Sequence, residues 1–375
     1  MKKREFLKVF SVATVGAFTF SSFALSCISP DRKPRLKNWA WIHPTGSSDS
    51  ANSKNEWKKL FSNLKKWNID YALLLTQTNS IIEQVIPVAK QEGVELHAWI
   101  IALNWPDKNT MKEHPQWYVV NGKGESCIDK PAYVNDYNWL CPTNPEVVEF
   151  LKKRVEELCA YDGLAGVHLD YIRYPDVVLA PEHKAKYDIP QDDLVHPQFD
   201  YCYCEVCRSK FKELSGMDPL TLPDQATNEA WLNFRFDTLT NLVNEIYDTV
   251  HKSGKILSAA VFPTPDLSKF RVRQDWLKWK LDYVMPMMYH RYEGQPVEWL
   301  ETATREGVEA LAGKIPLFSG LHLAQLKPQE LGLATSLSLK AGASGIVLFT
   351  GNAMNEEYWK YMKEGISSHK KYSES

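Results

Sequence analysis

The sequence predicts a (β/α)8 barrel with long loops after the third and fourth strands. Eight short apolar runs recur along the chain, and a segment of helical periodicity follows each of them. The runs are residues 39–42, 71–75, 96–102, 166–170, 256–262, 283–289, 315–321 and 345–349. Continuous apolar runs are typical of parallel strands that are covered on both faces. Eightfold alternation without a second compositional domain favours one barrel over residues 37–368, rather than a doubly wound open sheet.

The segments between the runs have the spacing of amphipathic helices. In residues 56–67 the large apolar side chains share one stripe, which comprises Trp57, Leu60, Phe61, Leu64 and Trp67. The other helical segments are residues 81–91, 145–160, 231–252, 274–280, 296–308, 327–341 and 355–366. Asn144 and Pro145 begin one of them as a cap residue and a first-turn proline.

Two connections are too long to be plain turns. The loop after the third strand extends from Asn104 to about Asn144, and the loop after the fourth extends from Tyr174 to about Thr227. Long loops in compact domains are usually functional. Both loops follow the carboxyl ends of strands, where barrel enzymes hold their active sites.

The composition limits the classes of partner. Among 375 residues, 44 lysines and arginines nearly balance 46 aspartates and glutamates, and the net charge is −2. This balance gives no reason to expect a nucleic acid as a partner. The 13 tryptophans, 17 tyrosines and 15 phenylalanines either fill a core of large side chains or stack on a planar or sugar-like ligand.

The amino-terminal segment predicts export. Four basic residues lie within MKKREFLK, and an uncharged apolar run follows as far as Ser26 and Cys27. This pattern is typical of a signal peptide, here residues 1–26. KREFLK resembles the twin-arginine export motif, and ALSC resembles a lipobox, which would make Cys27 a lipidated first residue. An ordinary cleaved signal and an uncleaved anchor are the alternatives. Residues 27–36 would be a linker and residues 369–375 a tail.

The stretch GVHLDYIRYP, residues 166–175, places charge at the end of the fourth strand. Alternation puts His168 and Asp170 on one face, pointing into the barrel. An ionised carboxylate there is costly unless it is paired or useful. Arg173 could close the strand end as an ion-pair partner, or could tune Asp170 and hold substrate. The position at the barrel mouth favours function. His97 and His168 lie lower in their strands and are expected in the core.

Four motifs carry a family resemblance. They are HLDYIRYP, WLCPTNPEV at 139–147, WLNFR at 231–235 and DYVMPMMYH at 282–290. With the eight-strand layout, they resemble the glycoside hydrolase-like family 10 barrels over nearly all of residues 37–352. The resemblance implies glycosidase chemistry on a polysaccharide, including the glycan strands of peptidoglycan.

A more distant resemblance is to family 18 chitinases, in which the fourth-strand segment ends D-x-E-Y-P. Ile172 stands where that family has its acid glutamate, and His290 replaces an aspartate after the sixth strand. Met287 and Tyr289 match the M-x-Y of that strand. Substrate-assisted catalysis by the chitinase glutamate is therefore not expected here.

Glycoside hydrolysis usually requires two carboxylates. Asp170 is expected to be one of them, as nucleophile or base. For the second, Glu293 is preferred slightly over Asp266, and for each a solvated loop position is the alternative. Asp275 is expected to pair with Arg271 or Arg273 instead.

The other strand ends carry aromatic side chains and neutral hydrogen-bonding groups that suit a sugar. The predicted substrate-binding residues are Trp41, His43, Asn104, Trp105, Arg173, Tyr289, His290, His322 and Asn352.

Three cysteines lie in one short segment, residues 202–207. Cys202, Cys204 and Cys207 have the spacing C-x-C-x2-C, which suits a tetrahedral Zn²⁺ with a fourth ligand from Cys141 or Cys127. The spacing resembles the zinc cluster of family 42 β-galactosidases. Disulfides are the alternative, because an exported chain meets oxidants. Zinc would be structural, and no cofactor is expected for catalysis.

Three functions remain open at this point. The first is an exported glycoside hydrolase, a periplasmic or cell-surface lipoprotein held at the membrane only by its lipid. The second is an inert barrel that binds glycan, because the second carboxylate is not evident. The third is a metal-dependent deacetylase or amidohydrolase, which ranks last because the first strand carries a single histidine, His43, rather than H-x-H.

Overall fold

The computed structural model describes residues 36–44, 51–76 and 78–372. The predicted signal peptide and Cys27 lie outside these residues. Eight parallel strands form one sheet in the order β6-β5-β4-β3-β2-β1-β8-β7. The strands are β1 (Trp39–Ile42), β2 (Tyr71–Leu75), β3 (Glu95–Ile101), β4 (Leu164–Asp170), β5 (Ile256–Val261), β6 (Tyr283–Pro286), β7 (Phe318–His322) and β8 (Gly345–Phe349).

The sheet closes between β6 and β7 through a few hydrogen bonds rather than a full ladder. The amide of Val284 donates to the carbonyl of Pro316 at 3.1 Å, and the amide of Met288 donates to that of Gly320 at 2.9 Å. A side chain at Gly320 would place its Cβ 2.7 Å from the Pro286 carbonyl oxygen, so glycine permits this approach. The predicted (β/α)8 barrel is therefore confirmed.

Alternate residues of each strand point into the barrel, as the period of two requires. The buried apolar side chains of the interior are Trp39, Trp41, Leu73, Leu75, Trp99, Ala260, Met285, Phe318 and Val347. His97 and His168 are both fully buried among them, as expected. His168 Nε2 lies 2.9 Å from Trp41 Nε1, which can only donate. His168 Nδ1 therefore carries the proton and donates to Ser258 Oγ at 2.8 Å.

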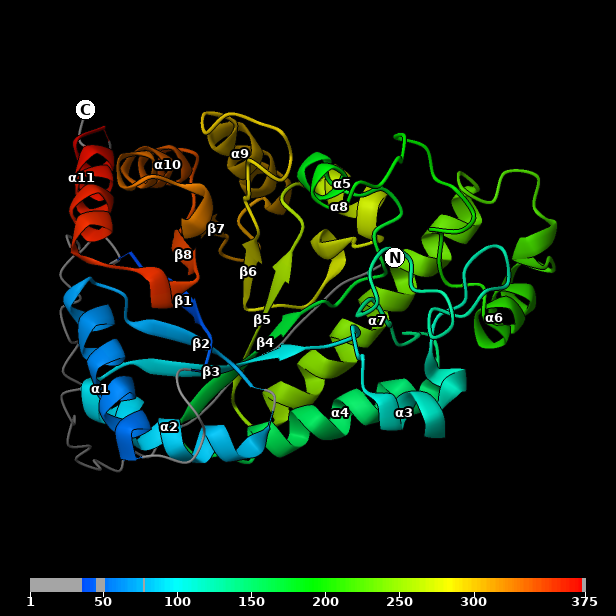
Figure 1. Ribbon diagram of the computed structural model, residues 1–375, viewed down its shortest axis with the longest axis horizontal. Coiled ribbons are helices and arrows are strands. Elements are labelled where there is room, and N and C mark those ends of the chain that lie inside the picture. Colours follow the sequence, from blue (N-terminus) through cyan, green and yellow to red (C-terminus); the bar gives the residue numbers. More distant parts are fainter. Residues whose placement is uncertain (1–35, 45–50, 77, 373–375) are drawn as a thin grey trace, which may run out of the picture. The chain divides into compact units, whose positions relative to one another are not determined.

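Helices surround the strands (Figure 1). They are α1 (Ala51–Lys66), α2 (Asn79–Glu92), α3 (Lys108–Glu113), α4 (Pro145–Cys159), α5 (Pro181–Lys186), α6 (Glu205–Ser215), α7 (Glu229–Lys252), α8 (Pro265–Val272), α9 (Trp299–Leu311), α10 (Pro328–Lys340) and α11 (Glu356–Tyr372). The carboxyl ends of the strands and the loops that follow them hold the site described below.

The prediction of a helix at residues 274–280 is wrong. Only a 3-10 turn, Trp276–Lys278, forms there, and the helix after β5 is α8. Thr264 caps α8 by accepting a hydrogen bond from the amide of Leu267 at 3.4 Å, and Pro265 occupies the first turn. Arg273 ends α8 in a left-handed conformation with φ 58°. The cap and proline are a helix start that the apolar periodicity alone does not reveal.

The two long loops lie side by side. Short helices α3 and α6, one from each loop, lie on the same side of the barrel in Figure 1. The amide of Tyr203 donates to the carbonyl of Val120 at 2.7 Å, and the amide of Gly122 donates to that of Pro197 at 2.8 Å. These bonds join the loop after β3 to the loop after β4, so the two loops form one wall of the barrel mouth.

Candidate active site

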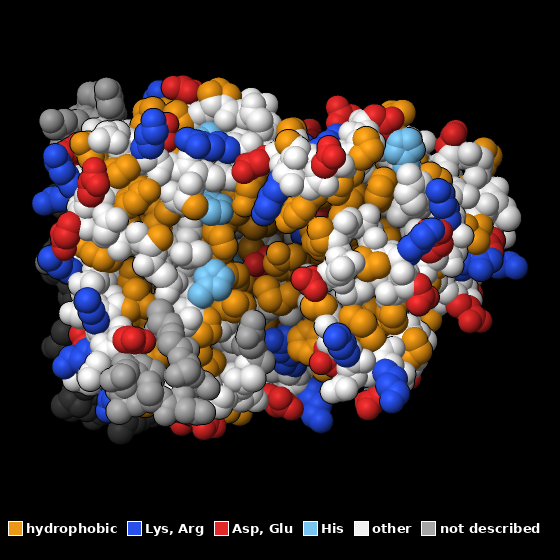
Figure 2. All heavy atoms as spheres, viewed as in Figure 1, with side chains coloured by type: hydrophobic (Ala, Val, Ile, Leu, Met, Phe, Trp, Pro, Cys, Tyr) orange, Lys and Arg blue, Asp and Glu red, His pale blue; other side chains and the backbone are white. Residues whose placement is uncertain are grey.

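A pocket of about 310 Å³ opens at the carboxyl ends of the strands. Figure 2 shows a hollow with mostly hydrophobic walls, an acidic side chain at depth and histidines along one side. The polar and aromatic residues that line the pocket include Trp41, His43, Trp99, Tyr137, Asp170, Tyr171, Arg173, Asp176, His183, Phe262, Tyr289, Tyr292, Glu293 and Phe349. Aromatic walls with a few charged groups are typical of a small-molecule site.

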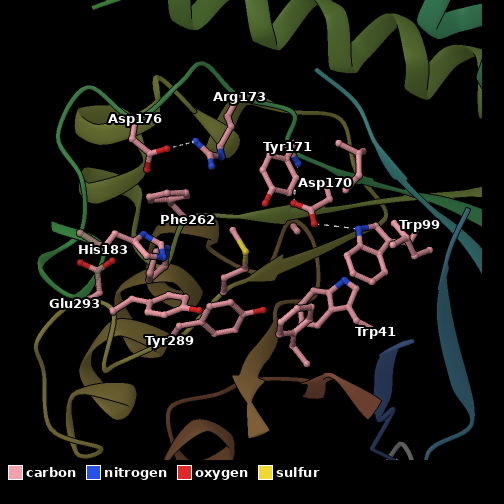
Figure 3. Close-up of a pocket in the computed structure, with 18 of the residues that line it drawn as sticks. Trp41, Trp99, Asp170, Tyr171, Arg173, Asp176, His183, Phe262, Tyr289 and Glu293 are labelled. Atoms are coloured by element: carbon pink, nitrogen blue, oxygen red, sulfur yellow. Dashed lines mark hydrogen bonds and ion pairs between the residues drawn. The ribbon is translucent and has the colours of Figure 1, made fainter. Parts of the chain in front are cut away.

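Asp170 is the last residue of β4 and is only 8% exposed. Its Oδ2 accepts a hydrogen bond from Trp99 Nε1 at 3.0 Å, and its Oδ1 accepts one from the Tyr171 amide at 2.7 Å (Figure 3). Burial raises the pKa of Asp170 to about 6, although both hydrogen bonds and the charge of Arg173 lower it. The carboxyl group can therefore hold a proton near neutral pH.

The backbone turns sharply after Asp170. Tyr171 has φ 52°, a left-handed conformation that costs a residue other than glycine about 1–2 kcal/mol. Such outliers concentrate at functional sites, where the surrounding structure holds them in place. The turn aims the Tyr171 amide at the Asp170 carboxylate, so it contributes directly to the site.

Arg173 does not pair with Asp170. Its Nη1 donates to Asp176 Oδ2 at 2.6 Å, and its Nη2 lies 3.3 Å from the hydroxyl of Tyr137. The guanidinium is also packed between aromatic rings, 4.7 Å from the ring centroid of Trp139. The ion pair that could have closed the strand end is therefore formed with Asp176, and Arg173 acts on Asp170 only through its charge.

Glu293 lines the pocket on the side away from Asp170, next to His183 (Figure 3). Its Oε2 accepts a hydrogen bond from Arg271 Nη1 at 2.6 Å. Burial raises the pKa of Glu293, and the charge of Arg271 opposes that rise. A second acid thus reaches the pocket from the loop after β6, but as half of an ion pair.

Two other acidic residues considered from the sequence, Asp266 and Asp275, lie outside the pocket. Asp266 is in the first turn of α8, beside Lys269 and Phe270 on the wall of a separate cavity. The expectation that Asp275 pairs with Arg271 or Arg273 is wrong, because Asp275 contacts Lys269 at 3.2 Å and Lys278 at 3.1 Å. The two arginines bind other carboxylates, Glu293 and Asp200 respectively.

In addition to Asp170, the structure brings five of the predicted substrate-binding and catalytic positions to the pocket wall, namely Trp41, His43, Arg173, Tyr289 and Glu293. The hydroxyl of Tyr289 has no hydrogen-bond partner among the residues that the structure describes. Burial, and then the charge of Asp170, raise the pKa of Tyr289, so its hydroxyl stays protonated. It can donate to, or accept from, a bound hydroxyl group.

The other predicted binding positions lie outside the pocket lining. Asn352 accepts from the His43 amide at 2.9 Å and donates to the His43 carbonyl at 3.1 Å, so it holds that residue in place. Trp105 donates to Thr110 Oγ1 at 3.2 Å. The three remaining positions are Asn104, His290 and His322.

The histidines at the pocket are neutral near pH 7. Burial lowers the pKa values of His43 and His183, and it lowers that of His322, which lies outside the lining, to about 4. Neutral imidazoles offer one donor and one acceptor each without adding positive charge. The pocket therefore presents hydrogen-bonding groups that suit uncharged hydroxyls.

Sequence reasoning missed several pocket residues. Trp99 lies in the predicted strand at residues 96–102, and its two-residue spacing from His97 places it on the inward face. Asp176 follows the Tyr-Pro of the fourth-strand motif by one residue, and that proximity was a usable signal. His183 comes from α5, inside a long loop, and no periodicity relates it to a strand.

The cysteine cluster lies outside the pocket and joins the two long loops. The ligand sulfurs of Cys141, Cys202, Cys204 and Cys207 all lie within 4.8 Å of one another. Sulfurs at about 2.3 Å from a tetrahedral zinc would be about 3.8 Å apart. Cys141 Sγ is 3.4 Å from Cys207 Sγ and 3.6 Å from Cys204 Sγ, so the set fits zinc. Cys127 instead contacts the backbone of Trp139.

Backbone amides support one sulfur of this cluster. The amides of Val120 and Cys204 each lie 3.4 Å from Cys202 Sγ. Donors of this kind stabilise a thiolate and orient it toward a metal. The cysteines are free thiols in the described part of the chain.

A family model described as Glycosyl hydrolase-like 10 matches residues 59–331. No curated protein sequence matches the chain.

Solved structures share the fold at low sequence identity. The β-galactosidase from Rahnella sp. R3 gives a TM-score of 0.60 at 10% identity, over 88% of this chain and 55% of that one. The enzyme from Halorubrum lacusprofundi gives 0.60 at 12% identity, over 89% and 58%. A catalytic mutant of Gan42B, a GH42 β-galactosidase from G. stearothermophilus, gives 0.62 at 10% identity, over 88% and 56%. This chain thus spans little more than half of their length.

Proposed function

Because this chain belongs to the glycosyl hydrolase-like 10 family, we propose that it hydrolyses glycosidic bonds in a polysaccharide, such as the glycan strands of peptidoglycan. The observation that carries the proposal is Asp170, a carboxyl group with a pKa of about 6 at the strand end that faces an aromatic pocket. A carboxyl group with a raised pKa is what a glycosidase uses to protonate the leaving group.

The raised pKa changes the role that we assign to Asp170. A nucleophile or base was expected from the sequence, but a carboxyl group that keeps its proton near pH 6 suits a general acid. Asp170 would give its proton to the glycosidic oxygen as the bond to the anomeric carbon breaks. A water molecule would then add to that carbon and lose its proton to a carboxylate, which yields two shorter sugars.

Two acids could accept the proton of the water. Glu293 and Asp176 line the pocket, and each is bound to an arginine through one oxygen, at 2.6 Å in both cases. An arginine partner favours the ionised form that a base needs, and in Glu293 it opposes the rise in pKa that burial causes. Glu293 remains the preferred candidate, because it lies across the pocket from Asp170 in Figure 3. Inverting glycosidases place acid and base on opposite faces of the sugar.

The pH dependence of kcat/KM tests the role of Asp170. Since a general acid must be protonated, the rate is expected to fall as the pH rises above about 6. The Trp99→Phe variant removes a hydrogen bond that favours the ionised carboxylate. The pH above which kcat/KM falls should then be about one unit higher than in wild type. The measurement is initial rates on a cleaved glycan between pH 4 and pH 9.

The control for this experiment is Trp39→Phe. Trp39 is also buried in the barrel, but its indole nitrogen has no hydrogen-bond partner among the described residues, so the pH above which kcat/KM falls should not change. A rate that falls below pH 6 instead would assign Asp170 an ionised role as nucleophile or base.

An inert glycan-binding barrel is the second candidate function. It is favoured by the ion pairs of Glu293 and Asp176, which leave Asp170 as the one pocket carboxylate without a cationic partner among the described residues. Glycan binding without any cleavage, across a panel of polysaccharides, would support this alternative. A metal-dependent deacetylase is less favoured, since in the described ranges only the four cysteines group as metal ligands.

We propose that the cysteine cluster binds a structural Zn²⁺. Cys141, Cys202, Cys204 and Cys207 would supply four thiolates, and the bound zinc would join the loop after β3 to the loop after β4. The zinc would lie outside the catalytic site, because none of these cysteines lines the pocket.

We propose also that the chain is exported and anchored by lipid at Cys27. The support is the sequence pattern alone, because residues 1–35 are outside the described part. No helix in the described ranges has the length and apolar character needed to cross a bilayer. Expression with a labelled fatty acid should mark the wild-type chain and leave Cys27→Ser unlabelled, with the variant released from membranes. Equal labelling of both would contradict the anchor.

A further inference from the structure

A series of aromatic side chains leads out of the pocket and across the loop after β4. The rings of Phe349 and His322 have centroids 4.9 Å apart, and those of His322 and Tyr292 are 5.8 Å apart. The series continues from Tyr292 to His183 at 4.6 Å and from His183 to Tyr187 at 6.2 Å. Phe349, Tyr292 and His183 line the pocket, whereas Tyr187 lies beyond it.

The outer part of the series is held together by contacts between α5 and the loop after β6. The amide of Glu182 lies 3.4 Å from the carbonyl of Tyr292. Gln325, which follows β7, donates to Glu182 Oε2 at 3.3 Å. These bonds position His183, on α5, and Tyr187, which directly follows α5, relative to Tyr292, so the ring arrangement does not depend on the rings alone.

The groups of this outer part are open to a ligand. Tyr187 is 44% exposed, and among the aromatic side chains of the described residues only Phe270 is comparably exposed. In the described part of the chain, the hydroxyl of exposed Tyr187 and the ring nitrogens of half-buried His183 have no hydrogen-bond partner, whereas the Tyr292 hydroxyl lies 3.5 Å from His322 Nε2. The Lys186 ammonium lies 5.1 Å from the centroid of the Tyr187 ring, a position that an exposed lysine can leave.

We propose that His183, Tyr187 and Tyr292 form a second sugar-binding subsite, which holds the glycan chain where it continues beyond the pocket. The apolar face of a sugar would stack on an exposed ring, and its hydroxyls would bond to the imidazole and phenol groups. The proposal rests on the proposed function and adds to it that the substrate is a chain of several sugars that is bound along its length.

The subsite is tested by the dependence of binding on chain length. Peptide-free glycan strands from peptidoglycan would be fractionated into disaccharides and octasaccharides. Calorimetry would measure their binding to the Asp170→Asn variant, which is expected to consume them about a hundredfold more slowly than wild type. The octasaccharide should bind more tightly than the disaccharide. Adding Tyr187→Ala should weaken octasaccharide binding about fivefold to tenfold and leave disaccharide binding unchanged.

Phe270→Ala, in the same background, is the matched control. Phe270 is 40% exposed, close to the value for Tyr187, but it lies on α8 and outside the pocket. Its replacement should change neither affinity. Thermal unfolding of each variant should match that of Asp170→Asn, because among the described residues the Tyr187 ring makes ring and cation contacts only with His183 and Lys186.

The subsite proposal would be overturned if the octasaccharide did not bind, or if it bound with the same affinity as the disaccharide. It would also be overturned if Tyr187→Ala weakened the binding of both oligosaccharides or of neither. Hydrolysis is measured separately, with the protein that retains Asp170. Chain-length-dependent binding without hydrolysis would therefore refute the proposed enzyme and keep the subsite, whereas hydrolysis without length dependence would do the reverse.

Discussion

Replacement of Asp170 by asparagine is expected to lower turnover about a hundredfold or more while the protein remains folded. The amide keeps the shape of the side chain but cannot deliver a proton to the leaving oxygen, a role that contributes about 10²–10⁴-fold in rate. The measurement is hydrolysis of a glycan panel that includes peptidoglycan strands, with wild type and variant compared at pH 6. The effect should appear in kcat more than in KM, because the proton is transferred only as the bond breaks.

The raised pKa of Asp170 also determines the sign of the stability change in Asp170→Asn. The folded-state pKa of Asp170, about 6, lies above the ordinary value of 3.8, so between these values the folded state binds more protons than the unfolded state. The wild-type free energy of unfolding therefore falls as the pH rises through this window, by up to about 3 kcal/mol from this group. Asparagine carries no charge to bury, but it loses one of the two hydrogen bonds, which costs about 1 kcal/mol.

We therefore expect Asp170→Asn to be at least as stable as wild type at pH 7, and less stable relative to it at pH 4. Urea unfolding at the two pH values measures this difference. Asp275→Asn is the control, because Asp275 is also buried but lies outside the pocket and pairs with Lys269 and Lys278. It should lose stability and keep its turnover. Full activity in folded Asp170→Asn would show that the strand-end acid is structural.

Loss of one cysteine of the cluster should have the second large effect. Cys207 is fully buried in the first turn of α6, where its sulfur faces that of Cys141. Cys207→Ser removes one of four proposed zinc ligands, so bound zinc should fall from about one equivalent to a small fraction. The free energy of unfolding should fall by more than about 3 kcal/mol, because metal binding contributes directly to folding.

The control is Cys159→Ser. Cys159 is also a buried free thiol, but it lies on α4 and outside the cluster, so zinc content should not change. Metal analysis of purified protein and urea unfolding with and without a chelator measure the two effects. Protein that contains almost no zinc and shows disulfides between Cys141, Cys202, Cys204 and Cys207 would refute the zinc proposal.

The sequence by itself determined the barrel and the position of Asp170. Both depend on local patterns, because a strand covered on both faces needs a continuous apolar run and a surface helix needs one apolar stripe. A carboxylate at an inward-facing position at the end of such a run must lie at the barrel mouth. The helix α8 was missed by the same logic, since a cap at Thr264 and a proline begin it without a clear apolar stripe.

The tertiary structure decided which groups face one another across the pocket. Arg173 binds Asp176 rather than Asp170, Arg271 binds Glu293 rather than Asp275, and Cys141 rather than Cys127 joins the cysteine cluster. Arg173 and Asp176 lie within one turn, and no periodicity of the sequence encodes the direction of that turn. The other two contacts join segments that are separated by a loop or by a whole strand–helix unit. The pKa of Asp170 has the same origin, because it depends on how deeply the Trp99 indole and the loop after β4 bury the carboxyl group. Spacing along a chain determines which face a residue occupies, but distance and burial across a barrel exist only once the chain has closed on itself.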